Sequence, residues 1–259
     1  MHVTEEQARL ADVDLAYRDS GGGGTPVVLL HAATGSVEAW EHQLPALCKA
    51  GYRVIAYSRR GYRGSGTGPP GQPGTGSGDL LALLDRLGVA SCHLVGIAAG
   101  GLVAADFALS HPGRLRSLTL ACTIVGLMDA DYLELGERLR PAGFNDLPVE
   151  FQELGPSYRA EHPEGVAQWL ALEGRSHSGG RFRQGTVNRL TWAAMQGLAV
   201  PTLMVNGDAD LWAPPALQRL FLRRLPQAEG VVIREAGHAA HWEQPGAFNT
   251  ALIGFLDRH

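Results

Sequence analysis

The sequence predicts an α/β fold with a mostly parallel central sheet flanked by helices. Short runs of Val, Ile and Leu recur along the chain, stretches with helical spacing separate them, and Gly or Pro marks their ends. Strands that alternate with helices indicate βαβ units, and strands that are apolar throughout are typical of a parallel sheet covered on both faces. The 259 residues, 45% of them hydrophobic, suffice for one large core.

Seven segments have the pattern of a strand. Residues 13–17 alternate apolar and polar side chains, as an edge strand does, and the glycines at 21–24 form the turn that follows. The other runs are almost purely apolar, which predicts buried strands. They cover residues 26–30, 52–57, 93–95, 115–121, 202–205 and 231–233.

Three segments have the spacing of a helix. Leucines at 80, 83, 84 and 87 share one helical face, so a helix is expected over 79–87 with Ser77 as its N-cap. A second helix is expected over 101–110, because Pro112 follows it closely. The third, over 245–256, is amphipathic and follows the last expected strand.

Residues 126–196 interrupt this alternation. They contain no convincing buried strand, and prolines at 141, 148, 156 and 163 divide them into short helical pieces. Such an insertion predicts a helical cap over a site, within an α/β core formed by residues 1–125 and 197–259. Trp169 and Trp192 of this insertion are candidate pocket residues.

Arginines are interleaved with aromatic residues in the same insertion. They suggest an anionic substrate, for example one that carries a carboxylate. The alternative, a helical subdomain with solvated charges, explains most of them. These arginines are Arg138, Arg140, Arg159, Arg175, Arg181 and Arg183.

The composition excludes several classes of partner and cofactor. A formal net charge of −4 leaves no electrostatic footprint for nucleic acid or an anionic membrane. The three cysteines lie far apart and form no Cys/His ligand spacing, so neither a disulfide framework nor a structural metal is expected. No signal peptide or membrane-spanning run is evident, which predicts a cytoplasmic protein that acts on a small molecule. The sequence is also compatible with a homodimer.

A glycine-rich stretch at 61–78 contains one match to a dinucleotide-binding motif. Gly66-Thr-Gly-Pro-Pro-Gly71 fits G-x-G-x-x-G by letter. Its glycines lie well past the preceding strand, and two prolines remove amide donors that a pyrophosphate would need. We therefore expect a surface loop and no cofactor.

The segment after residue 95 has the frame of a nucleophile elbow. Gly96-Ile-Ala98-Ala-Gly100 joins an expected strand to an expected helix. In the motif G-x-S-x-G the glycines permit close approach of the backbone, while the central residue adopts a strained conformation that projects its side chain. Here the centre is Ala98 instead of serine.

An acid and a histidine follow in the order that such a site requires. Asp210 lies three residues past Gly207, after an expected strand, and Gly237-His238 follows the last expected strand. Asp208 competes with Asp210 for the role of the acid. The order along the chain is therefore nucleophile position, acid, histidine.

These motifs, spread over nearly the whole chain, resemble those of the α/β-hydrolase family. Residues 31–36 (HAATGS) are similar to its H-G-x-x-G-S loop, with alanine in place of the first glycine. Residues 60–65 (RGYRGS) are similar to R-G-x-G-x-S, with Arg63 and Gly64 in reverse order. The family places the acid three residues past the glycine, which favours Asp210.

The resemblance implies a role for each site residue. His238 would act as general base and then as general acid, and Asp210 would hold its tautomer and stabilise its charged form. The backbone amides of Ala33 and Ala99 would form the oxyanion hole, which needs no particular side chains. This chemistry requires only protein groups and water, so the resemblance implies no cofactor.

A metal site is not expected. His238, His241 and Glu243 are close in sequence, but the pattern H-E-x-x-H is absent. We expect His31 and His241 to pack or to form structural hydrogen bonds instead.

Alanine at position 98 cannot attack a carbonyl, so the chain as written should not form an acyl-enzyme. Either a serine has been replaced so that a substrate binds without being cleaved, or alanine is natural and the pocket serves binding or chemistry run by His238 alone. The retained Asp210 and His238 favour a replacement, because a buried acid and base without a nucleophile have little structural value.

The leading hypothesis is a Ser-His-Asp hydrolase of a small-molecule ester or lactone, inactivated by alanine at position 98. Carbon–carbon bond hydrolases of the same family rank second, because they commonly carry a tryptophan after the histidine, where this chain has Ala239. Epoxide hydrolases and haloalkane dehalogenases need an aspartate at the elbow, so neither alanine nor a replaced serine at position 98 fits them. A hypothesis of another class is a natural pseudo-hydrolase that binds a ligand or assists a cyclisation. A structural module ranks last.

Overall fold

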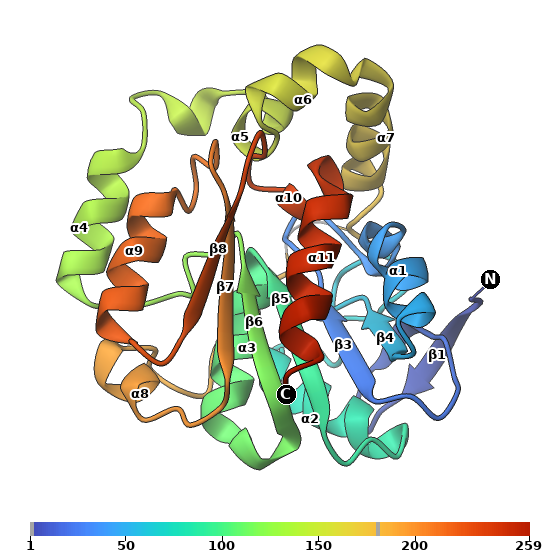
Figure 1. The fold of residues 1–259 in the computed structure, drawn as a ribbon. Coiled ribbons are helices and arrows are strands. Elements are labelled where there is room, and N and C mark those ends of the chain that lie inside the picture. Colours follow the sequence, from blue (N-terminus) through green and yellow to red (C-terminus); the bar gives the residue numbers. More distant parts are fainter. Residues whose placement is uncertain (1–2, 180–181) are drawn as a thin grey trace.

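The computed structural model describes residues 3–179 and 182–259, and an eight-stranded sheet lies at its centre (Figure 1). The strand order is β1-β2-β4-β3-β5-β6-β7-β8. β1 pairs antiparallel with β2, β2 pairs antiparallel with β4, and the other neighbours are parallel. The predicted fold class is confirmed. The strands are β1 (Glu5–Arg9), β2 (Asp14–Asp19), β3 (Pro26–Leu30), β4 (Arg53–Tyr57), β5 (Cys92–Ile97), β6 (Leu115–Ala121), β7 (Thr202–Gly207) and β8 (Glu229–Ile233).

The seven predicted strands are all present: β3 and β6 have the predicted bounds, and the ends of the other five differ by at most two residues. β1 is an additional strand that the sequence does not predict. Four of its five residues are exposed, so it has no apolar run by which it could be recognised. Its position at the antiparallel edge of the sheet explains this polarity, because an edge strand contacts the core with few side chains.

Helices cover both faces of the sheet, and each face has its own hydrophobic core. Because successive side chains of a strand point to opposite faces, β3 sends Val28 and Leu30 into one core and Val27 and Leu29 into the other. None of the described helices combines the length and the apolar character needed to cross a bilayer. The helices outside the segment between β6 and β7 are η1 (Val37–Trp40), α1 (Gln43–Lys49), α2 (Gly76–Arg86), α3 (Ala99–Ser110), η2 (Pro112–Arg114), α9 (Pro215–Arg224), α10 (Ala240–Glu243) and α11 (Pro245–Leu256).

The three predicted helices correspond to α2, α3 and α11, and α11 has the predicted bounds. The predicted N-cap of α2, Ser77, is wrong. Thr75 is the N-cap, and its hydroxyl accepts the amide of Gly78 at 3.1 Å. Ser77 lies inside the first turn and is buried. A serine and a threonine two residues apart both precede the leucines, so side-chain type alone does not distinguish them.

Between β6 and β7 the described part of the chain forms helices and no strand. In Figure 1, α5, α6 and α7 form an arch above one edge of the sheet, and we refer to these three helices as the arch. α4 and α8 instead lie beside α9. The helices of this segment are α4 (Ala130–Leu139), η3 (Phe144–Asp146), α5 (Val149–Glu153), α6 (Pro156–Glu161), α7 (Pro163–Gly174) and α8 (Trp192–Gln196).

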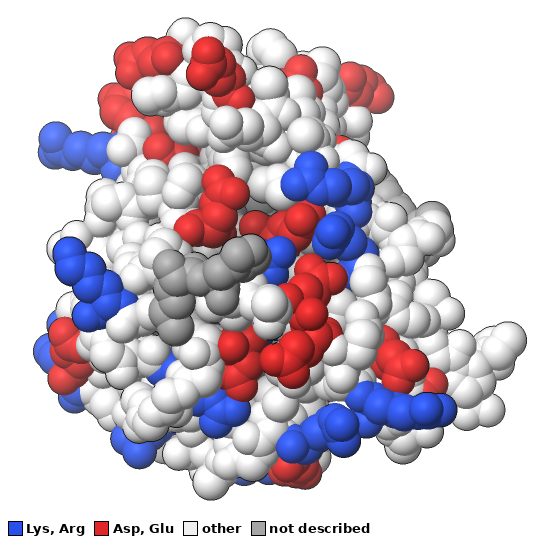
Figure 2. All heavy atoms as spheres, turned by 90° about the vertical axis from the view of Figure 1, so that its right-hand side faces the viewer, with Lys and Arg blue, Asp and Glu red and all other residues white. Residues whose placement is uncertain are grey.

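An ion pair connects the end of the arch to the body of the protein. Arg175, directly after α7, places its Nε 2.8 Å from a carboxylate oxygen of Glu38 in η1. Acidic and basic side chains are intermingled on the face that carries α7 (Figure 2). Exposed pairs of this kind contribute little to stability, so other contacts must hold the arch in place.

Candidate active site

The turn between β5 and α3 holds Ala98 in a strained conformation. Its φ of 50° and ψ of −115° lie outside the regions that alanine ordinarily adopts. The glycines on either side are sterically required: a Cβ at Gly96 would lie 2.5 Å from the carbonyl oxygen of Gly100, and a Cβ at Gly100 would lie 2.2 Å from that of Leu30. The strand, turn and helix expected from the G-x-A-x-G spacing are therefore present.

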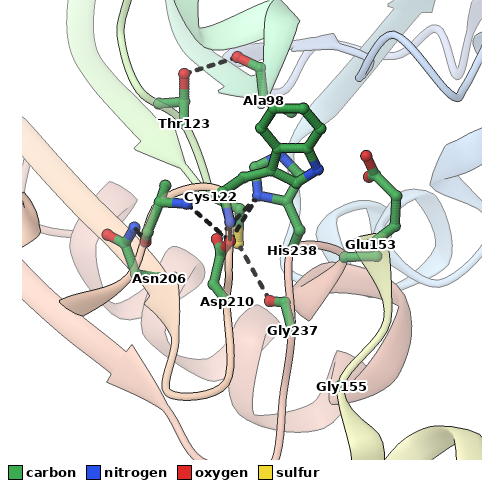
Figure 3. A network of polar contacts seen from close by, with 12 residues as sticks. Ala98, Cys122, Thr123, Glu153, Gly155, Asn206, Asp210, Gly237 and His238 are labelled. Carbon is green, nitrogen blue, oxygen red and sulfur yellow. Dashed lines mark hydrogen bonds and ion pairs between the residues drawn. The ribbon is translucent and has the colours of Figure 1, made fainter. Parts of the chain in front are cut away.

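His238 and Asp210 form a buried hydrogen-bonded pair (Figure 3). His238 Nδ1 lies 2.9 Å from both carboxylate oxygens of Asp210. Asp210 Oδ1 also accepts two backbone amides of the following turn, at 2.8 and 2.9 Å, which fix the carboxylate. The competing Asp208 instead accepts the amide of Ala236 at 3.3 Å. The structure thus pairs the histidine with Asp210.

Parallel strands bring the three sequence-predicted residues to one edge of the sheet. Ala98 follows β5, Asp210 follows β7 and His238 follows β8. These strands run in the same direction, so their carboxyl ends meet at a shared edge, which is where ligands bind in open α/β sheets. Figure 3 shows the three residues gathered there.

Two carboxylates act most strongly on the imidazole of His238. Burial by itself disfavours the charged ring, but the negative charges of Asp210 and Glu153 outweigh burial and raise the pKa of His238 to about 9. In Figure 3 the Glu153 carboxylate lies on the side of the ring away from Asp210. The imidazole is therefore charged at neutral pH and must lose a proton before it can act as a general base.

The amides of Ala33 and Ala99 lie at the ends of two neighbouring strands. Ala33 belongs to the loop after β3, and Ala99 is the first residue of α3. Among the described residues neither amide donates a hydrogen bond, so both can bind an oxyanion. Arg59 braces the first loop, because its guanidinium donates to the carbonyls of His31 and Ala32 at 3.2 and 3.3 Å.

His31 and His241 are buried and have structural contacts. His31 Nε2 accepts the amide of Arg59 at 3.0 Å, and the ring of His241 packs against Trp40 and Phe248. Burial lowers the pKa of His31 well below its ordinary value and that of His241 to about 3, so both rings are neutral at neutral pH. Within residues 3–179 and 182–259, no group of three or more His, Cys, Asp or Glu side chains is arranged to hold a metal ion.

A small cavity lies beside His238, and Trp169 of α7 lines it. Trp192, the other candidate pocket residue, does not reach this cavity. It is buried in the core of the sheet, where its ring packs against Tyr132 and Phe221. Trp192 therefore does not face this cavity, because α8 packs against the body of the protein.

The described arginines of residues 126–196 do not line this cavity either. Arg175 is about half exposed and pairs with Glu38, and Arg159 lies over the ring of Phe151 at 4.1 Å. Arg181 lies outside the described residues. The expectation of an anionic substrate therefore lacks a cationic side chain in the described part of the cavity wall.

Glu153 is a residue of the cavity that the sequence does not single out. It ends α5 and is 8% exposed. Thr34 Oγ1 donates a long hydrogen bond of 3.5 Å to its carboxylate. Burial raises the pKa of Glu153, although the charge of His238 opposes this effect. No motif marks this residue, because the sequence of α5, VEFQE, contains two glutamates and only the tertiary structure shows which one is buried.

The end of α5 is fastened to the loop that carries His238. The backbone carbonyl of Glu153 accepts the amide of His238 at 2.7 Å. The buried carboxylate of Glu243 accepts the amide of Gly237 from the same loop at 2.9 Å and the amide of Gly155 from the arch at 2.7 Å. Burial raises the pKa of Glu243 to about 7, although these amides favour its charged form. The same group of hydrogen bonds thus holds the arch and the loop that carries His238 together.

Comparisons with known proteins place nearly the whole chain in one family. A family model described as "Alpha/beta hydrolase family" matches residues 27–251. A solved esterase from Thermogutta terrifontis is 27% identical, with a TM-score of 0.80 over 98% of both chains. A solved enol-lactonase from Burkholderia xenovorans is 25% identical, with a TM-score of 0.76 over 97% of this chain and 100% of that one. Epoxide hydrolase A from Mycobacterium tuberculosis is 28% identical over 98% of this chain and 97% of that protein.

Proposed function

Because the chain belongs to the alpha/beta hydrolase family, we propose that it carries the site of a small-molecule ester or lactone hydrolase in which alanine stands in place of the nucleophilic serine. The observation that carries this proposal is the buried Asp210–His238 pair at the sheet edge where Ala98 forms its strained turn. Buried charges of this kind add little to stability by themselves. Their retention beside a strained turn points to acyl transfer at position 98.

A serine at position 98 would complete the reaction. Its Oγ would attack the carbonyl carbon of the ester while His238 Nε2 takes the hydroxyl proton. The amides of Ala33 and Ala99 would stabilise the negative charge that develops on the carbonyl oxygen. The charged imidazole would then give its proton to the departing alkoxide. Water would cleave the acyl-enzyme by the same route, with Asp210 stabilising the imidazolium in both steps.

Two solved structures support the choice of substrate class. These relatives are an esterase and an enol-lactonase, and both reactions break a carbonyl carbon–oxygen bond. The arrangement of domains follows the same proposal. We assign residues 126–196 to a segment inserted into the core of residues 1–125 and 197–259, with the arch as the part that caps the sheet edge and α4 and α8 packed beside α9.

The substitution Ala98→Ser tests the proposed function. We expect hydrolysis of 4-nitrophenyl butyrate at least about 10³-fold faster than by the unaltered chain, since loss of a nucleophile costs up to about 10⁶ in turnover. The double substitution Ala98→Ser/His238→Ala should abolish this gain, and Ala98→Gly, which alters the same turn without adding a hydroxyl, should show none.

A folded Ala98→Ser protein without esterase or lactonase turnover would reject the proposal. Cleavage of a carbon–carbon bond in a β-diketone, without ester cleavage, would assign the protein to the second hydrolase class.

Ala98 itself favours a second candidate, a pseudo-hydrolase that binds a ligand or assists a cyclisation without hydrolysis. The methyl group leaves the site able to hold a carbonyl compound but unable to form an acyl-enzyme. This candidate predicts tight binding of one small molecule by the unaltered chain. It also predicts no gain of hydrolysis in Ala98→Ser, so the same experiment separates the two functions.

A further inference from the structure

The cavity beside His238 is small and largely apolar. Its free volume is about 20 Å³, which is enough for one water molecule. Ala39, Ile97 and Trp169 contribute apolar wall, and the carboxylate of Glu153 contributes a strongly polar group. A ligand group that enters here must therefore be compact, with its polar end directed at Glu153.

Glu153 has few hydrogen-bond donors for a buried carboxylate. Its carboxylate accepts a hydrogen bond from the hydroxyl of Thr34 at 3.5 Å, a distance at the limit of a hydrogen bond. The nearby indole N–H of Trp212 favours the charged form of Glu153 but has no acceptor among the described residues. A buried carboxylate with unfilled acceptor positions is unfavourable unless water or a ligand supplies donors. The geometry thus provides a position for a donor group.

Negative charge predominates in the wall of the cavity beside His238, while Arg159 lines a second cavity that Glu153 also borders. Asp210 and Glu153 both act on the ring of His238, and the imidazolium balances only one of these two negative charges. Glu243, whose pKa is about 7, adds a partial negative charge. Among the described residues, no lysine or arginine lines the cavity. A field of this sign attracts a cation and repels a carboxylate.

We propose that Glu153 is a specificity-determining residue that binds a primary ammonium group of the substrate. This inference rests on the proposed function, because it concerns the ester held at the same site. An ammonium group offers three donors, which match the acceptor positions of Glu153, and the rings of Trp169 and Trp242 in the cavity wall attract cations. The small volume favours a primary ammonium over a trimethylated one.

Binding to the unaltered chain tests this inference without any turnover. β-Alanine methyl ester, methyl butanoate and monomethyl malonate have similar lengths and end in an ammonium, a methyl and a carboxylate group. In NMR titrations we expect the ammonium ester to bind at least about tenfold more tightly than methyl butanoate, because its hydrogen bond is charge-assisted. Monomethyl malonate should bind most weakly. An equal or reversed order, or no binding of the ammonium ester, would overturn the inference.

Substitutions on α5 assign the effect to one residue. Glu153→Gln keeps the size of the side chain and removes its charge, so the preference for the ammonium ester should fall to about twofold or less. Methyl butanoate, which has no charged end, is the reference ligand for this ratio in each variant. Glu150→Gln makes the same change one helical turn earlier, away from the cavity, and should keep the full preference. A full preference in Glu153→Gln would show that another group binds the ammonium. If Glu153→Gln fails to fold, Glu153→Asp keeps the charge and should keep the order of the three ligands.

The two proposals fail separately. An ammonium preference in the unaltered chain, without hydrolysis by Ala98→Ser, rejects the hydrolase function alone. Hydrolysis of an uncharged ester by Ala98→Ser, without any ammonium preference, rejects the role of Glu153 alone.

Discussion

The backbone carbonyl of Glu153 accepts the amide of His238 at 2.7 Å, and both side chains line the same cavity. One residue of the arch therefore positions the loop that carries the histidine and also acts on the charge of its ring. A substitution of the glutamate side chain leaves the carbonyl contact in place. The electrostatic effect of Glu153 can thus be tested apart from its effect on the backbone.

Glu153→Gln should move the pH profile of the Ala98→Ser protein to lower pH. His238 must be neutral to act as a base, and the charge of Glu153 helps to raise its pKa to about 9. Loss of that charge lowers the pKa, so the neutral ring is populated at lower pH. At pH 7 we expect kcat/KM for an uncharged ester to rise about three- to tenfold.

The measurement is kcat/KM for 4-nitrophenyl butyrate from pH 6 to pH 10. Glu150→Gln in the same Ala98→Ser background should leave the rising limb of the profile in place. A limb that Glu153→Gln does not move would contradict the assignment of this carboxylate to the pKa of His238.

Asp210→Asn and Asp208→Asn should differ sharply in the Ala98→Ser background. Asp210 accepts the hydrogen bond of His238 Nδ1, so its amide would stabilise the wrong tautomer and reduce kcat by about 10³- to 10⁴-fold. Asp208 accepts a hydrogen bond from the backbone amide of Ala236 instead, and its substitution should cost less than about tenfold. Steady-state kinetics of both variants decide between the two acids. Similar losses would show that catalysis does not depend specifically on the hydrogen bond between Asp210 and His238.

The fold could be predicted because its strands are buried on both faces. β5, for example, consists of six buried residues and is visible as an apolar run. β1 escapes prediction because its sequence, EEQAR, is polar and mostly exposed. α1 is also unpredicted, since its seven residues are too few to show a helical repeat. α9 is unpredicted although its buried Leu217, Leu220 and Phe221 have helical spacing.

The site could be predicted only where a motif reports local geometry. The glycines around Ala98 mark a turn that excludes side chains, and Gly237-His238 marks the end of a strand. Glu153 carries no such mark, because its role arises from the packing of α5 against a loop more than 80 residues away in the chain. Trp169 and Trp192 show the same limit, since their spacing does not reveal which one faces the cavity.

Glu243→Gln should change how the stability of the protein depends on pH. Burial raises the pKa of Glu243 from its ordinary value of 4.5 to about 7, so the folded chain binds this proton more tightly than the unfolded chain does. The resulting stabilisation is fully present below pH 4.5 and is lost as the pH rises through 7. Between pH 5 and pH 8, the free energy of unfolding of the parent should therefore fall by about 2 kcal/mol more than that of Glu243→Gln.

Urea denaturation of both proteins at pH 5 and pH 8 checks this difference. Glu161→Gln, a substitution at an exposed residue of the arch, should keep the pH dependence of the parent. Parallel pH dependence in the parent and in Glu243→Gln would show that the carboxylate titrates at its ordinary pKa.

Gly100→Ala and Gly254→Ala add the same methyl group to two helices and should have opposite effects. A Cβ at Gly100 would lie 2.2 Å from the carbonyl oxygen of Leu30, so the start of α3 would have to move away from β3 and take the Ala99 amide with it. We expect a loss of about 3 kcal/mol or more in the free energy of unfolding. Gly254 lies within α11, and a Cβ there meets nothing within 4 Å, so alanine should stabilise the helix by about 0.5–1 kcal/mol. Urea denaturation measures both changes. A Gly100→Ala protein as stable as its parent would show that β3 and α3 are not in backbone contact at this point. The proposal that the amides of Ala33 and Ala99 bind the same oxyanion would then lose its structural support.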